Sequence, residues 1–144
     1  MRVALSFWIA GAAYVALIVV GVVSFVISGP DTWSSYLLEP MHLTGLVPPV
    51  VASLVALLLR RTQTIMQFIA AGLAFLLVAP ATTFAAVWIE TVLSSDAHYD
   101  GYYAFSVVLA LLYVQIPQLV VAIIACAVMS VVSAARRSRR HTPA

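Results

Sequence analysis

Long apolar segments separated by short polar ones dominate the chain. Three of them contain no charged residue: Val3–Ile27, Ile65–Ile89 and Ala104–Ala135. Each exceeds the roughly 20 residues that a helix needs to cross a hydrocarbon layer of about 30 Å. The apolar segment before Arg60 is shorter. A helix that begins at Pro40 would be long enough to span, and proline is tolerated in a first helical turn. The pattern therefore predicts a single domain of four spanning helices, at about 3–27, 40–59, 65–89 and 104–135, followed by a basic tail, 136–144.

Composition supports the same class. Hydrophobic residues make up 64% of the sequence and charged residues only 8%, with a mean hydropathy of +1.10. A soluble domain needs about 25% charged residues to cover its surface. We therefore expect an all-α membrane protein, a four-transmembrane-helix bundle whose direct surroundings are the lipid bilayer.

The charges alternate in sign from one predicted loop to the next. The seven basic residues occupy Arg2, the pair Arg60 and Arg61, and the segment Arg136–Arg140. The five acidic residues all fall between the predicted spans on the opposite side, at Asp31, Glu39, Glu90, Asp96 and Asp100. Basic loops remain in the cytoplasm during insertion. The distribution predicts that the N- and C-termini are both cytoplasmic.

Residue usage indicates the kind of cell. The sequence contains neither Lys nor Asn and is rich in Ala, Val and Arg, which is typical of a GC-rich bacterial genome. We expect a multi-pass protein of the bacterial plasma membrane. The first apolar segment is longer than the 7–15 residues of a signal-peptide core, so we expect it to be kept as a helix.

Several functional classes are disfavoured by what the predicted spans contain. Ionisable side chains inside a membrane are costly and usually mark proton or ion pathways, yet no charged residue lies within the predicted spans. Cys126 has no His near it in the same leaflet, and no phosphate-binding glycine loop is present. The short basic tail carries no interleaved aromatic residue, which disfavours nucleic-acid binding. Topology alone could explain its arginines, although they could also contact anionic lipid headgroups. We expect no enzymatic activity and no cofactor.

Two groups of residues have metal-ligand spacing. Glu39 and His42 lie three apart, and Asp96, His98 and Asp100 alternate along the chain. A shared Zn or Cu site is conceivable because carboxylate and imidazole are suitable ligands. A proline interrupts the first pair, however, and acidic outer loops are commonly solvated. We interpret both groups as solvated loop residues and predict no metal site.

Prolines inside the spans mark one level of the membrane. Each proline removes a helical hydrogen bond, so Pro48, Pro49, Pro80 and Pro117 would free the carbonyls of Thr44, Gly45, Leu76 and Tyr113. Non-helical backbone at depth must be satisfied by protein or by a water-filled cavity. Polar side chains near this proline level form a candidate ligand site: Thr44, Thr82, Thr83, Gln115 and Gln118. The alternative is that prolines and polar side chains only hold the bundle together.

A stripe of small side chains recurs every four residues along the fourth predicted span. Its members are Ala122, Cys126, Ser130 and Ala134. Small side chains let two helices approach closely in lipid, where close packing supplies the attraction. The partner could be the first helix of the same chain, another membrane protein or a second copy. We refer to these four residues as the small-residue stripe.

These observations favour a non-enzymatic membrane protein that acts by association. The expected role is an accessory or assembly subunit of a larger bacterial envelope or respiratory complex. The alternative is a small oligomeric transporter or lipid carrier with an outward-facing polar pocket at the proline level. Architecture alone does not decide between them.

Overall fold

The computed structural model describes residues 1–29, 44–94, 108 and 111–140. The described residues form helices and no strand, which confirms the all-α prediction. The elements are α1 (Arg2–Ser28), the 3-10 turn η1 (Thr44–Leu46), α4 (Val47–Leu58), α5 (Thr64–Ser94), the π-helical segment η2 (Leu111–Gln115) and α7 (Ile116–Arg140).

Three helices among the described residues are long and apolar enough to cross a membrane. They cover Arg2–Ile27, Thr64–Ile89 and Leu111–Arg136, and correspond to the first, third and fourth predicted spans. Three helices of this length and composition are consistent with a membrane protein. The second predicted span corresponds to a shorter apolar helix, Thr44–Leu58.

The start of α4 differs from the expected helix 40–59. Regular α-helix begins at Val47, with prolines in its first turn, and η1 precedes it. Pro48 and Pro49 therefore begin a helix, and the interpretation of this pair as defects deep within one is wrong. The physical reason is that a first turn has no helical acceptors for its amide hydrogens, so two prolines there cost little. Pro40 lies outside the described residues.

The other helices extend beyond their expected limits. Helix α5 continues past Ile89 to Ser94, and α7 continues past Ala135 to Arg140, so part of the expected basic tail is helical. Pro80 lies inside α5. The π-helical η2 ends at Gln115, two residues before Pro117.

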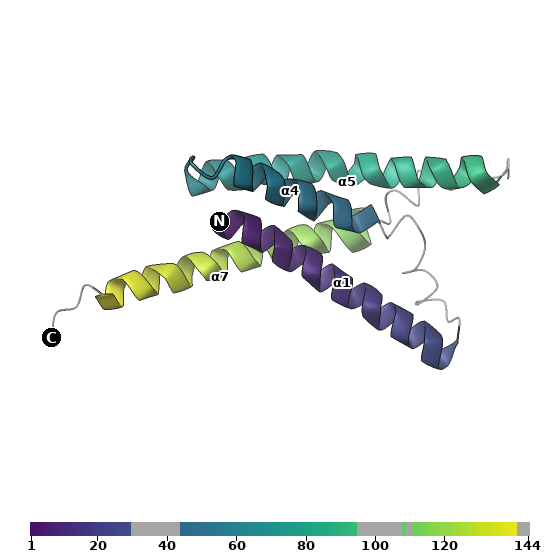
Figure 1. The fold of residues 1–144 in the computed structure, drawn as a ribbon, viewed down its shortest axis with the longest axis horizontal. Coiled ribbons are helices and arrows are strands. Elements are labelled where there is room, and N and C mark those ends of the chain that lie inside the picture. Colours follow the sequence, from purple (N-terminus) through teal and green to yellow (C-terminus); the bar gives the residue numbers. More distant parts are fainter. Residues whose placement is uncertain (30–43, 95–107, 109–110, 141–144) are drawn as a thin grey trace.

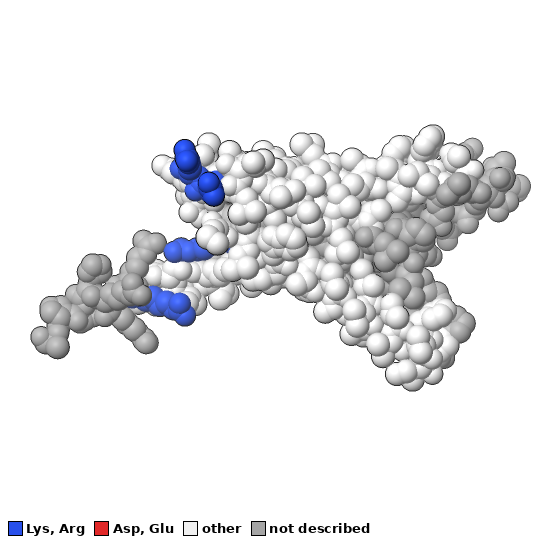
Figure 2. Space-filling view, in the orientation of Figure 1, with Lys and Arg blue, Asp and Glu red and all other residues white. Residues whose placement is uncertain are grey.

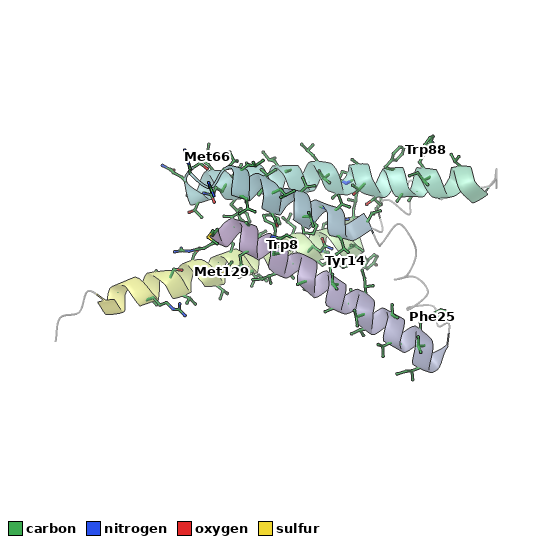
Figure 3. The ribbon with its side chains drawn as sticks, viewed as in Figure 1. Trp8, Tyr14, Phe25, Met66, Trp88 and Met129 are labelled. Atoms are coloured by element: carbon green, nitrogen blue, oxygen red, sulfur yellow. The ribbon has the colours of Figure 1, made fainter. Side chains whose placement is uncertain are left out.

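The helices are arranged as an antiparallel pair and a crossing pair (Figure 1). Helices α4 and α5 lie side by side, while α1 crosses α7 next to them; the α4–α5, α1–α7 and α1–α4 pairs make the most extensive contacts. The N-terminus, the α4–α5 turn and the end of α7 all point toward the left of the view. Helices α1 and α5 diverge toward the opposite end, where Phe25 and Trp88 lie far apart (Figure 3).

The core is built from small side chains around one aromatic group. The ring of Phe7 lies 6.0 Å from that of Phe68 and 5.9 Å from that of Phe75, measured between centroids. Ser53 ties α4 to α1, because its hydroxyl contacts the carbonyl oxygen of Ala4 at 3.3 Å as well as that of Pro49 at 2.7 Å. Close approach of the helices follows from the buried alanines, Ala4, Ala10, Ala52, Ala56, Ala71, Ala79 and Ala122.

Candidate functional site

The two irregular segments η1 and η2 meet beside α1. Gly45 of η1 is buried between Tyr14 of α1 and Val114 of η2. A Cβ atom on Gly45 would lie 2.8 Å from Cε1 of Tyr14 and 2.8 Å from Cγ1 of Val114. Only glycine therefore fits without displacing its neighbours. We call the group of Tyr14, Gly45, Val114 and Gln118 the Gly45 junction.

A side chain of α7 completes this junction. Nε2 of Gln118 donates a hydrogen bond to the carbonyl oxygen of Gly45 at 2.9 Å. In a continuous helix that carbonyl would accept from the amide of residue 49, but Pro49 has no amide hydrogen. Gln118 supplies the missing donor, and its side chain is only 4% exposed. The structure thus brings two members of the predicted proline level together, a backbone carbonyl and a glutamine.

Two buried acceptors at this level lack a partner among the described residues. They are Oε1 of Gln115 and Oε1 of Gln118. Gln115 is 3% exposed and belongs to η2, one turn before Gln118. A buried carbonyl oxygen without a donor costs about 1–3 kcal/mol. The two amides are therefore the chemically least satisfied groups in the described part of the protein.

A cavity of about 210 Å³ adjoins the junction. Its polar lining comes from Gln118, Tyr14 and Tyr113, and the rest of its wall is mainly aliphatic. Tyr14 lies where α1 passes the beginning of α7 (Figure 3). Pro117 also lines the cavity, two residues after the π-helical segment ends at Gln115. Such segments displace side chains from regular helical positions and are frequent at functional sites. The π-helix has no clear sequence signal besides Pro117, so sequence reasoning missed it.

The three threonines occupy different settings. Thr83 is fully buried, and its hydroxyl donates to the carbonyl oxygen of Ala79 at 2.9 Å. The Thr82 hydroxyl lies 2.9 Å from the carbonyl oxygen of Val78. Both threonines thus bond within α5 around its internal proline, and among the described residues no hydrogen bond joins them to Gln115 or Gln118. Thr44 is half-buried in η1 beside Gly45.

The burial of the small-residue stripe decreases along α7. Ala122 is fully buried in the core, whereas Cys126 and Ser130 are half-buried and Ala134 is exposed. The Ser130 hydroxyl donates to the Cys126 carbonyl at 2.8 Å, within the same helix. One end of the stripe therefore belongs to the internal bundle, and the other end is uncovered by the described residues.

The residues with metal-ligand spacing all lie outside the described residues: Glu39, His42, Asp96, His98 and Asp100. Within 1–29, 44–94 and 111–140, no group of three or more His, Cys, Asp or Glu side chains could share a metal ion.

The Gly45 junction offers hydrogen bonding in an apolar setting. Its polar side-chain groups are the Gln118 amide and the Tyr14 hydroxyl, which are neutral and suited to holding a backbone or a small polar group. No protein-family model matches the chain, and comparisons with curated proteins and with solved structures found no match.

Proposed function

We propose that this protein is a non-enzymatic subunit that acts by association within a bacterial plasma membrane. It crosses the membrane four times with both termini in the cytoplasm, and it assembles with another membrane protein as an accessory or assembly subunit of a larger envelope or respiratory complex. The observation that carries this proposal is the small extent to which α7 is covered by its own bundle.

The span that contains α7 has fewer buried residues than the other two long spans. In Leu111–Arg136, 11% of the most apolar stretch is buried, compared with 22% in Arg2–Ile27 and 22% in Thr64–Ile89. Figure 1 shows α7 continuing well past its crossing with α1. The exposed end of the small-residue stripe lies on this continuation, at Ala134. Small side chains are what close helix packing in lipid requires, which supports an external helix as the partner.

The arrangement of charge supports the proposed orientation. Figure 2 shows the described arginines gathered at one end of the molecule. They are Arg2, the pair Arg60 and Arg61, and Arg136, which belong to three segments of the chain. Basic residues at one end of a helical bundle define its cytoplasmic side. In this orientation the shorter helix Thr44–Leu58 belongs to the second proposed crossing.

The cavity beside the Gly45 junction favours a second candidate. A small oligomeric transporter or lipid carrier would need polar groups in a pocket at depth, and Gln118 and Tyr14 contribute such groups to a cavity that is otherwise mainly aliphatic. A cavity of about 210 Å³ suits a small ligand or part of a lipid. This candidate predicts that the chain forms an oligomer of itself and needs no other protein.

A matched pair of variants tests the association. Ala134 and Ala135 are both exposed on α7, but they point about 100° apart around the helix. Ala134→Leu should reduce the amount of co-purifying partner several-fold, because the larger side chain separates the two helices. Ala135→Leu should leave it unchanged while both variants accumulate in the membrane. Full retention of the partner by Ala134→Leu would contradict association through this face.

A further inference from the structure

A groove at the α4–α5 turn combines an apolar wall with two cations. It has a volume of about 650 Å³ and is lined by Leu54, Leu57, Leu58, Arg60 and Arg61. The leucines are spaced three and four residues apart, which places them on one side of α4. All three are exposed, Leu58 to 83%. The groove therefore presents an aliphatic surface that leads directly to two arginines.

Hydrogen bonds hold the turn in a defined shape. The amide of Arg60 donates to the carbonyl oxygen of Leu57 at 3.2 Å, and the amide of Thr62 donates to that of Leu59 at 2.9 Å. The Thr62 hydroxyl donates to the Leu59 carbonyl at 2.8 Å. From α5, Nε2 of Gln67 donates to the Thr62 carbonyl at 2.8 Å. Hydrogen bonds from α4 and α5 thus fix the backbone that carries both arginines. Because this backbone is already ordered, less entropy is lost when a ligand binds.

The two guanidinium groups are available to an anion. Arg60 and Arg61 are exposed, and neither forms an ion pair with any residue in the described part of the chain. Among the described residues at this end of the visible surface, the charged side chains that Figure 2 shows are basic. Guanidinium groups bind phosphate through paired hydrogen bonds, more specifically than an ammonium group does.

We propose that this groove binds an anionic phospholipid. Its phosphate lies between Arg60 and Arg61, and one acyl chain follows the leucines of α4. The apolar wall selects a lipid rather than a free phosphate, and two unpaired positive charges select a headgroup with net negative charge over a zwitterionic one. The inference rests on the membrane placement given under Proposed function, but not on association through α7.

Native mass spectrometry of the full-length protein in detergent tests the site. The probes are phosphatidylglycerol, phosphatidylcholine with the same acyl chains, and soluble glycerol phosphate. Phosphatidylglycerol should bind most tightly. Each arginine close to an anionic lipid contributes about fivefold to the affinity, so the double variant Arg60→Gln/Arg61→Gln should bind about thirtyfold more weakly. The matched control is Arg136→Gln, which removes an exposed arginine at the same end but outside the groove; its affinity should stay within about twofold of the unmodified protein.

Three results would overturn the lipid site. These are equal binding of the two lipids, unchanged affinity in the double variant, and glycerol phosphate binding as tightly as phosphatidylglycerol, which would indicate a site for a free anion. A photoreactive phosphatidylglycerol with its probe in the acyl chain needs no variant: it should label residues 54–58 of the unmodified protein, and labelling confined to other segments contradicts the proposal. Alkaline extraction tests the membrane placement separately. Protein that stays in the membrane but shows no lipid preference contradicts only the lipid site, whereas released protein contradicts the placement itself.

Discussion

The side-chain amide of Gln118 donates a 2.9 Å hydrogen bond to the backbone carbonyl of Gly45, 73 residues earlier in the chain. Neither Pro48 nor Pro49 has an amide hydrogen to offer that carbonyl, so Gln118 of α7 supplies the donor at the start of α4. The bond is buried and joins two helices that are far apart in sequence. It explains how a helix with two prolines in its first turn remains attached to the bundle.

Replacing Gln118 tests the value of this bond. Gln118→Met keeps the length of the side chain but removes the donor, leaving the Gly45 carbonyl buried without one. We expect the free energy of unfolding, measured by titration with sodium dodecyl sulfate in mixed micelles, to fall by about 1–2 kcal/mol. Gln115→Met is the matched control. Because its Oε1 has no partner among the described residues, its removal should leave stability unchanged or raise it. Equal loss in both variants would show that the bond to Gly45 contributes nothing specific.

Two glycines should respond in opposite directions to an added methyl group. In Gly45→Ala the Cβ would lie 2.8 Å from atoms of Tyr14 and Val114, so we expect a loss of about 1–3 kcal/mol from overpacking. In Gly72→Ala, inside α5, the Cβ would meet nothing within 4 Å. That variant should gain about 0.5–1 kcal/mol from the better helix propensity of alanine. The same unfolding titration measures both, and a stable Gly45→Ala protein would contradict the close packing of η1 against α1 and η2.

Phe7 should be the most sensitive aromatic position in α1. Its ring contacts Phe68 and Phe75 of α5, and each such ring pair contributes about 0.5–1.5 kcal/mol. Phe7→Leu should therefore lower the free energy of unfolding by about 1–2 kcal/mol. Phe25→Leu is the control, because Phe25 is exposed near the end of the same helix. An equal loss of unfolding free energy in Phe7→Leu and Phe25→Leu would contradict a core centred on Phe7.

The orientation can be checked with fused reporters. A reporter active only in the cytoplasm should function after Ala144 and at Arg61, whereas one active only outside the cell should function at Ser95. These results follow from four crossings with the basic end in the cytoplasm. Activity of the outside reporter at Ala144 would exclude four crossings with cytoplasmic termini.

The long helices could be predicted from the sequence because the hydrocarbon layer imposes a minimum length on an apolar segment. The core could not be predicted in the same way. In water, apolar periodicity marks the buried side of a helix, but in lipid the exposed side is equally apolar. Phe7 is buried and Phe25 is exposed, although nothing in the local pattern distinguishes them. Small and polar side chains are better indicators, as Ser53 and Ala122 illustrate.

Some residues of the candidate site could be predicted from the sequence, but their pairing could not. Gly45 was named as a carbonyl freed by proline and Gln118 as a polar residue at a similar depth, but their pairing depends on where η1 meets α7. The sequence could not reveal that Pro48 and Pro49 begin α4, because a proline pair is compatible with a first turn and with a kink. The only sequence signal of the π-helical η2 is Pro117, and a proline alone does not predict a π-helix. Thr82 and Thr83 bond within α5, so proximity in depth did not imply a shared site.

The mass of the intact assembly after gentle extraction from its native membrane tests the proposed function most directly. The chain alone has a mass of 15.4 kDa. Association with another membrane protein predicts a complex whose mass includes at least one different chain, and that chain should be lost from the Ala134→Leu variant. A species with a mass equal only to one 15.4 kDa chain, or to a whole-number multiple of it, would contradict the accessory role.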